Sequence, residues 1–177
     1  MNVKRITKDA ILLALFVVIG MFSIPLGDNI KVSLQFMILI IIFSLSDGLL
    51  DAILIPTLYL LLGLIAPIYA GFMSGITPTF GFVLSFPIIA IPFYLLMRFL
   101  KFNFHIKFII ASSISLLIVY LIGSLFMMFY LKIDLGYTLL IAVVPYIGFD
   151  IIKIILSMFI VKMMPPYIKP TYINNEK

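Results

Sequence analysis

The chain has 177 residues, of which 64% are hydrophobic and only 11% are charged. Soluble domains carry about 25% charged residues, so this composition excludes an ordinary soluble fold and indicates one integral membrane domain over residues 1–177. Cysteine is absent and there is a single histidine, which excludes disulfides, thiolate metal sites and histidine-rich zinc sites.

The first half of the chain predicts three membrane-embedded helices. Residues 6–24 are about as long as the 20 residues that cross the hydrocarbon core. Residues 32–45 are apolar but short for a full span, so we expect them to be tilted or partly re-entrant. Residues 49–66 form the third helix, in which Pro56 predicts a kink.

The next segment, residues 67–79, differs from its neighbours because it holds two prolines, two glycines and three Ser or Thr residues but no charge. A loop that is merely solvated usually carries charges, whereas a loop that folds back over a pocket need not. Ser74, Thr77 and Thr79 are equally candidates for ligand contacts and for capping or turn roles. Thr79 also fits the N-cap of the helix that follows.

The second half predicts three further helices, at residues 80–100, 108–131 and 149–164. Pro87 and Pro92 predict bending of the first of them. Residues 138–144 are apolar but too short to span, and Pro145 and Gly148 interrupt the run before the last helix. The chain therefore predicts six spans.

The placement of the basic residues orients these spans with both termini in the cytoplasm. Excess Lys and Arg marks cytoplasmic loops, and of the 12 such residues nine fall on the proposed inner side, against Lys31 and Lys132 outside. The same rule explains the net charge of +5 without nucleic-acid binding. The nine inner residues are Lys4, Arg5, Lys8, Arg98, Lys101, Lys107, Lys162, Lys169 and Lys177.

An acid and a base three residues apart, Asp150 and Lys153, lie in the last apolar run. Charge at membrane depth is costly and indicates a functional site by default. The spacing puts both side chains on one helix face, one turn inside an outer helix N terminus that attracts anions. We expect a pocket for a small carboxylate, with Lys153 meeting the carboxylate and Asp150 accepting N–H donors or holding Lys153. The alternative is an ion pair whose members only neutralise each other.

Other residues have two interpretations each. Tyr69 and Phe82 are candidates for stacking on a ligand ring, although most aromatic residues in this chain must serve packing. Ala10 and Ala14 form a small-x-x-x-small pair, which favours close helix packing either within the bundle or against another membrane protein. Phosphate-binding, metalloprotease and nucleophile-elbow motifs are absent from the sequence. We therefore expect no catalytic residue, no metal and no cofactor.

An ordered series of short motifs resembles the BioY family, the biotin-binding S components of energy-coupling factor transporters. The resemblance implies an all-α integral membrane protein, a bundle of six transmembrane helices in the bacterial cell membrane that binds biotin near its outer face. It implies a transport subunit and not an enzyme. The motifs are residues 24–27 (IPLG), 32–35 (VSLQ), 58–65 (LYLLLGLI), 70–71 (AG), 77–82 (TPTFGF) and 148–153 (GFDIIK).

The resemblance also implies partners and site residues. The partners are a transmembrane coupling protein, which Ala10 and Ala14 would face, and two ATPase subunits that supply the energy. Asp150 and Lys153 occupy positions that bind the ligand in the family. Thr77, Phe80 and Ser85 depart from the family pattern, which leaves another small carboxylate such as lipoate as an alternative ligand. A structural membrane protein without a ligand, and a membrane enzyme using Asp150 and Lys153 as an acid–base pair, are further alternatives.

Overall fold

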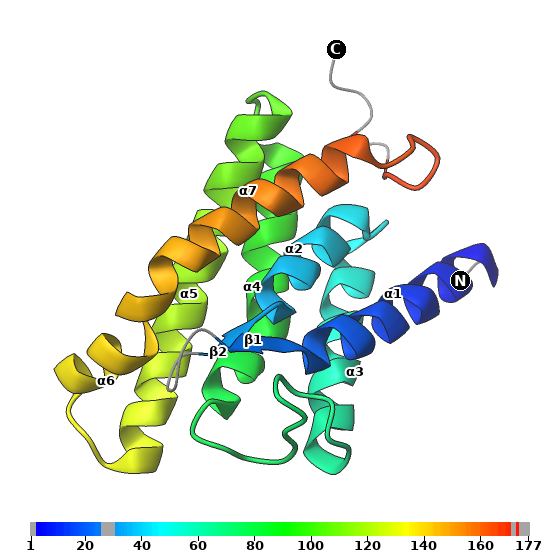
Figure 1. Ribbon diagram of the computed structural model, residues 1–177. Coiled ribbons are helices and arrows are strands. Elements are labelled where there is room, and N and C mark those ends of the chain that lie inside the picture. Colours follow the sequence, from blue (N-terminus) through cyan, green and yellow to red (C-terminus); the bar gives the residue numbers. More distant parts are fainter. Residues whose placement is uncertain (1–2, 26–30, 171–172, 174–177) are drawn as a thin grey trace.

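The computed structural model describes residues 3–25, 31–170 and 173, so the second half of the motif at residues 24–27 and Lys177 lie outside the described residues. The described chain is helical apart from one two-stranded hairpin (Figure 1). In chain order the elements are α1 (Val3–Met21), β1 (Ser23–Pro25), β2 (Lys31–Ser33), α2 (Gln35–Leu45), α3 (Leu49–Ile65), α4 (Phe80–Phe99), α5 (Phe104–Leu131), α6 (Leu135–Ala142), the 3-10 helix η1 (Val144–Tyr146) and α7 (Ile147–Met163).

The hairpin corrects two expected helix boundaries. The first helix was expected to continue to residue 24, but α1 ends at Met21 and β1 pairs antiparallel with β2, with Ser23 opposite Ser33. The expected segment 32–45 begins in β2, so that α2 keeps only 11 residues. A helix of that length rises about 16 Å, roughly half of the hydrocarbon core. Short apolar runs do not distinguish strand from helix by periodicity, which explains the error.

Within the described residues, three segments are long and apolar enough to cross a membrane. They are α4, α5 and the continuous stretch Leu135–Met163, which comprises α6, η1 and α7. The helices α2 and α3 are apolar but shorter. The described residues thus form an all-helical membrane bundle, around which the hairpin and the loop at residues 66–79 are arranged.

The last helical stretch starts earlier than expected and is broken near its middle. The Oδ2 atom of Asp134 accepts a hydrogen bond from the backbone N–H of Gly136 at 2.7 Å and so caps α6. Pro145 has no N–H to donate, and at this point the backbone passes through η1 before α7 begins at Ile147. This break sets Asp150 within the first turn of α7.

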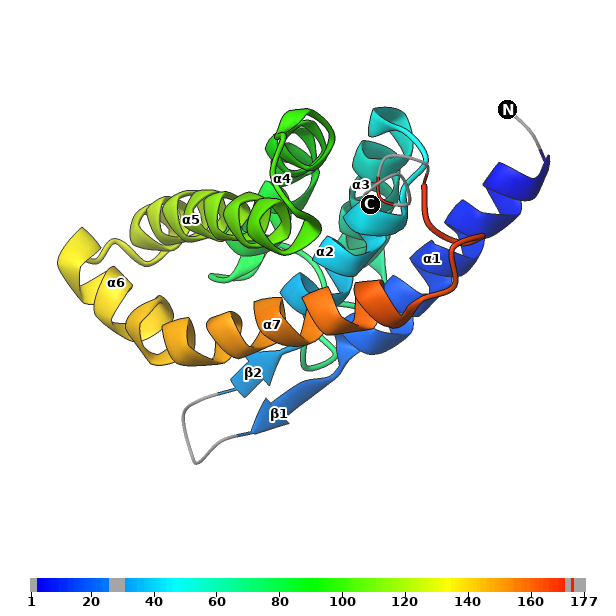
Figure 2. The same ribbon diagram turned by 90° about the horizontal axis from the view of Figure 1, so that it is seen from above.

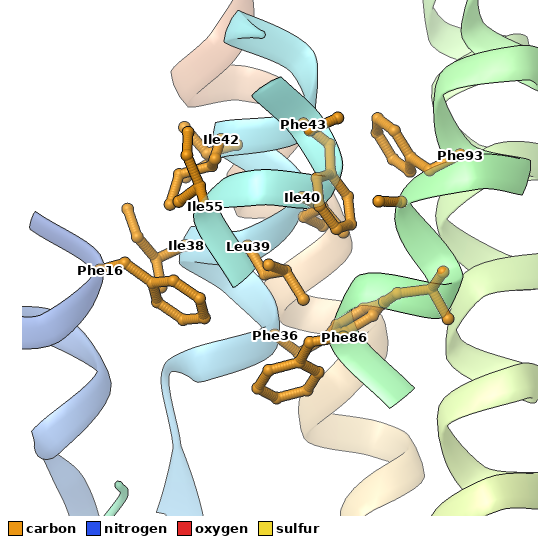
Figure 3. Close-up of a cluster of buried hydrophobic side chains, with 14 of the residues drawn as sticks. Phe16, Phe36, Ile38, Leu39, Ile40, Ile42, Phe43, Ile55, Phe86 and Phe93 are labelled. Atoms are coloured by element: carbon orange, nitrogen blue, oxygen red, sulfur yellow. The ribbon is translucent and has the colours of Figure 1, made fainter. Parts of the chain in front are cut away.

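The core is centred on α2, where every residue except Met37 is buried. A helix in which apolar residues occupy every side has no polar face and belongs inside a bundle. Figure 3 shows its side chains between Phe16 of α1 on one side and Phe86 and Phe93 of α4 on the other. Seen from above in Figure 2, α2 lies among α1, α3, α4 and α7.

Two glycines let α4 and α5 approach closely. A Cβ atom on Gly81 would overlap Phe126, and one on Gly123 would overlap the ring of Phe82. Each helix therefore inserts an aromatic side chain over a glycine of the other, a form of the small-residue packing common in membranes. The close approach fixes Phe82 at the start of α4.

The loop at residues 66–79 folds back onto the helices instead of extending into solvent. The backbone N–H of Gly71 donates to the Met21 carbonyl at 2.9 Å, and that of Gly75 donates to the Gly63 carbonyl at 2.9 Å. Gly71 and Gly75 have φ of 74° and 73°, a region that costs glycine little. These bonds tie the loop to the ends of α1 and α3.

Candidate functional site

A cavity of about 520 Å³ lies between α4, α5, α7, the loop at residues 66–79 and the hairpin. Small-molecule sites typically enclose roughly 300–1,000 Å³. Much of its lining is apolar, with Phe36, Phe80, Phe82 and Phe86 among the residues that contribute. The polar residues fall into two groups on different elements, which are described in turn.

The first group, here called the charged wall, consists of Tyr120 of α5, Tyr146 of η1, and Asp150 and Lys153 of α7. Lys153 Nζ donates to Asp150 Oδ1 at 2.6 Å, and Tyr120 Oη donates to Asp150 Oδ2 at 2.5 Å. Asp150 and Lys153 are only 6% and 7% exposed. Short bonds of this kind to an ionised group are the strong ones in proteins.

This geometry gives Asp150 and Lys153 different chemical roles. Each oxygen of Asp150 already accepts one hydrogen bond, so the carboxylate is held in place by a cation and a phenol. Lys153 has three N–H donors, and Asp150 is the one side-chain partner of its Nζ among the described residues. Lys153 therefore offers further donors to a ligand in the cavity, whereas Asp150 mainly orients it.

The second group, here called the neutral wall, comprises Ser23, Ser33, Gln35, Tyr69, Thr77 and Thr79. Gln35 is the first residue of α2, and its Nε2 donates to Tyr59 Oη at 2.7 Å. Tyr59 Oη in turn donates to the Ile68 carbonyl at 2.8 Å. The wall is thus assembled from the hairpin, α2 and the loop, and α3 supports it from behind.

Tyr69 is held firmly within the neutral wall. It is 4% exposed, and its hydroxyl donates to the Leu60 carbonyl at 2.6 Å. Burial raises the pKa of Tyr69 to about 12, so the phenol stays protonated at physiological pH. Its ring fills the space beside Gly63, where a Cβ atom would overlap it. Tyr69 therefore contributes an uncharged aromatic side chain to the lining of the cavity.

Six of the seven residues predicted to contact a ligand line the cavity, and Ser74 does not. Ser74 is exposed. The hydroxyls of Thr77 and Thr79 lie 3.2 Å apart, and Thr79 occupies the N-cap position of α4 without a side-chain capping bond. The six that line it are Tyr69, Thr77, Thr79, Phe82, Asp150 and Lys153.

The sequence interpretation missed several polar residues of the cavity. Gln35 stands out in retrospect because it is a lone amide in an apolar segment. Tyr120 gave no such signal, since it is one of nine tyrosines and lies 30 residues from Asp150. The residues missed are Ser23, Ser33, Gln35, Tyr120 and Tyr146.

Two of the positions that depart from the expected pattern are also placed. Phe80 lines the cavity and contacts the ring of Tyr69, with ring centroids 6.3 Å apart. Ser85 is buried, and its hydroxyl donates to the Phe82 carbonyl at 2.5 Å, away from the lining. The extra bulk of Phe80 thus narrows the cavity itself, while Ser85 acts on the helix behind it.

The small residues of α1 lie on the opposite side of that helix from the core. Ala10 and Ala14 are exposed, whereas Leu12, Phe16 and Gly20 are buried. Because Ala10 and Ala14 are exposed, they do not form a close small-x-x-x-small contact with another helix of the described chain. This face of α1 is open to contact from outside the described residues.

Known proteins share the sequence and the fold of this chain. The model of a family described as the BioY family matches residues 1–169. The biotin transporter BioY2 of Lactococcus lactis subsp. cremoris (strain MG1363) is 30% identical over 163 residues, which cover 85% of this chain and 84% of that protein. A crystal structure at 2.1 Å of the S-component for biotin from an ECF-type ABC transporter matches with a TM-score of 0.78 and 26% identity, over 90% of this chain and 89% of the other.

Proposed function

Because the chain belongs to the BioY family, we propose that it is the substrate-binding membrane subunit, or S component, of an energy-coupling factor transporter that takes up biotin. It is an integral membrane protein and a transport subunit, not an enzyme. The observation that carries the assignment beyond family membership is the cavity with its buried Asp150–Lys153 pair.

The chemistry of the cavity suits biotin. Biotin has a carboxylate on an apolar chain and a ring with a ureido group, which offers two N–H donors and one carbonyl acceptor. The charged wall supplies the N–H donors of Lys153, and the neutral wall supplies uncharged polar groups. Phe36, Phe82 and the other apolar lining residues complement the chain and the ring. In this proposal Lys153 binds an acceptor of the ligand, and Asp150 and Tyr120 keep Lys153 in position.

We propose a single membrane domain with six membrane-embedded helical segments, both termini in the cytoplasm and the cavity near the outer face. Counting α6, η1 and α7 as one segment supports the number of six. Two ion pairs at the start of α1 support the orientation, because they join basic residues to the α2–α3 turn and to the first turn of α3. Arg5 Nη2 lies 2.7 Å from Asp51 Oδ2, and Lys8 Nζ lies 2.8 Å from Asp47 Oδ1.

We propose that the chain works with a transmembrane coupling protein and two ATPase subunits of an energy-coupling factor module. Within the part of the chain that the structure describes, the exposure of Ala10 and Ala14 supports docking of α1 on the coupling protein. Replacing both by Leu would then abolish uptake by cells while leaving binding of biotin by the isolated chain intact.

Ligand binding by the purified full chain in detergent tests the assignment. We expect saturable biotin binding by the wild type, and loss of it in Lys153→Ala. Asp150→Asn should weaken binding less, because it removes the charge that orients Lys153 but keeps the donor itself. Lipoate is the competitor that distinguishes the alternative ligand. A well-folded sample that binds lipoate and not biotin, or neither, would contradict biotin as the ligand.

A further inference from the structure

Gln35 lies where the neutral wall meets the cavity, and its amide can be oriented in two ways. Exchange of the amide oxygen and nitrogen leaves the shape of the side chain unchanged but replaces an acceptor by a donor. The neighbouring hydrogen bonds decide between the two. The orientation matters because Gln35 is 7% exposed and lines the cavity.

The direction of each hydrogen bond in this group follows from the chemistry of its partners. The Ile68 carbonyl oxygen can only accept, so the Tyr59 hydroxyl must use its single proton there, at 2.8 Å. Tyr59 Oη can then only accept from Gln35, at 2.7 Å. Gln35 must therefore direct Nε2 at Tyr59 and hold Oε1 on the other side. Within the described residues the side-chain hydrogen bond of Gln35 is the one that Nε2 makes, which leaves Oε1 able to accept from a ligand in the cavity.

Tyr59 is fixed tightly enough to hold this orientation. Its side chain is fully buried, and its ring stacks on Phe16 with centroids 3.9 Å apart and an interplanar angle of 17°. Gly20 leaves no spare room, since a Cβ atom there would lie 2.8 Å from Tyr59 Oη. A flipped Gln35 would place its oxygen against a hydroxyl oxygen that has no free proton, so the flip costs a buried hydrogen bond.

We propose that Gln35 is a specificity-determining residue that presents a fixed acceptor to an N–H donor of the ligand, with Tyr59 and the Ile68 carbonyl as positioning groups. This inference rests on the proposed function, in which the donor is a ureido N–H of biotin. A buried acceptor left without a donor loses its hydration without replacement. A site built in this way rejects an isosteric ligand that lacks the N–H. Lipoate has no N–H and would leave Oε1 unpaired.

The test uses two cyclic carbamate analogues of biotin, in each of which one ureido N–H is replaced by oxygen. They keep the shape of biotin but put an acceptor where a donor was. The purified full chain should bind one of them on the order of 10-fold more weakly than biotin. Gln35→Met removes the acceptor at similar side-chain length, so it should weaken biotin binding about 10-fold. In this variant the affinities for biotin and for the discriminated carbamate should lie within about 2-fold of each other.

Two further variants distinguish a positioning role from a structural one. Tyr59→Phe frees the Gln35 amide to flip and donate to the carbamate oxygen, so it should reduce the discrimination between the two ligands by about 3-fold or more. Tyr94→Phe removes the hydroxyl of another buried tyrosine, which accepts from Arg98, and should leave both affinities and their ratio unchanged. If Tyr59→Phe does not fold, Gln35→Met decides, because it leaves Tyr59 in place.

A wild type that binds biotin and both carbamates equally would overturn the inference while leaving the proposed function intact. So would a Gln35→Met variant that keeps the full discrimination. A folded wild type that binds no biotin would overturn the proposed function, and this assignment with it.

Discussion

The two walls of the cavity are built in opposite ways. The charged wall rests on two residues three positions apart in α7 and on one phenol of α5. The neutral wall brings together the hairpin, the start of α2 and the loop at residues 66–79, and it contains no ionised group. A local pair with full charges supplies strong but unselective attraction, whereas an assembled set of neutral groups supplies shape and direction. We therefore expect the charged wall to dominate affinity and the neutral wall to dominate selectivity.

The largest effect should come from Lys153→Met. This change leaves the Asp150 carboxylate buried with Tyr120 as its remaining partner, and uncompensated buried charges cost about 3–5 kcal/mol in the free energy of unfolding. Biotin affinity should fall on the order of 100-fold, because a buried charged donor is lost. Chemical denaturation and ligand titration of the purified variant measure the two quantities.

The double variant Asp150→Asn/Lys153→Met is the control for this prediction. It removes both charges, so most of the stability should return while biotin binding does not. A double variant as unstable as Lys153→Met would show that packing, and not charge compensation, sets the stability of the charged wall.

The neutral wall should be most sensitive to Gly63→Ala. The new Cβ atom overlaps the Tyr69 ring, and overpacking of this kind costs about 1–3 kcal/mol of stability. The displaced ring should also weaken biotin binding, since Tyr69 lines the cavity. Thermal denaturation with and without biotin measures both effects.

Gly148→Ala is the matched control on the helix of the charged wall. No atom lies within 4 Å of the Cβ position at Gly148, and alanine favours a helix over glycine by roughly 0.5–1 kcal/mol. We expect a small gain in stability. A loss of equal size at Gly63 and Gly148 would mean that the two walls do not differ in how tightly they are packed.

Tyr120→Phe should have an intermediate effect confined to the charged wall. It removes the donor to Asp150 Oδ2, so Asp150 holds Lys153 less firmly, and biotin affinity should fall about 10-fold for one lost bond to a charged group. Tyr130→Phe is the comparison, because Tyr130 is 48% exposed and makes a longer bond of 3.3 Å to the Ile76 carbonyl. Equal losses of biotin affinity in the two variants would contradict the role of Tyr120 in positioning Lys153 through Asp150.

The smallest expected effect is a difference in biotin affinity between variants of two serines, Ser33 and Ser74. Ser33 lines the cavity and Ser74 is exposed outside it. Ser33→Ala should weaken biotin binding by about 3-fold, in line with one neutral hydrogen bond, whereas Ser74→Ala should change neither affinity nor stability measurably. Titration of both variants side by side measures the two affinities, and a larger loss in Ser74→Ala would place the ligand nearer the tip of the loop at residues 66–79 than we propose.

The charged wall could be predicted from sequence because its signal is local. Asp150 and Lys153 are charges in an apolar run, and their spacing alone puts them on one helix face. The neutral wall depends on contacts between distant segments, so its serines carried little signal, and Gln35 was marked only as a lone amide in an apolar run. Tyr120 joins the charged wall across 30 residues of sequence, and nothing in its surroundings distinguishes it from the other tyrosines.

In the fold too, local features could be predicted from the sequence and long-range contacts could not. Long apolar helices were located well, as the expected residues 49–66 and 80–100 compare with Leu49–Ile65 and Phe80–Phe99. The hairpin was wrongly assigned to helix at both of its strands, because pairing between β1 and β2 is a tertiary property that an apolar run does not reveal. The count of six spans and the cytoplasmic termini stay predictions.

The position of α1 has a thermodynamic consequence. The buried face of α1 contacts Tyr59 through Phe16 and Gly20. Its exposed face carries Ala10 and Ala14. Only the thickness of one helix, about 10 Å, therefore separates this exposed face from Tyr59. A protein that docks on the exposed face of α1 and shifts this helix would alter how Tyr59 holds Gln35, and thus the affinity for the ligand. Linkage requires the ligand to change the affinity for that docked protein by the same factor. Binding of the ligand and docking of the other protein would then be linked by a single coupling free energy.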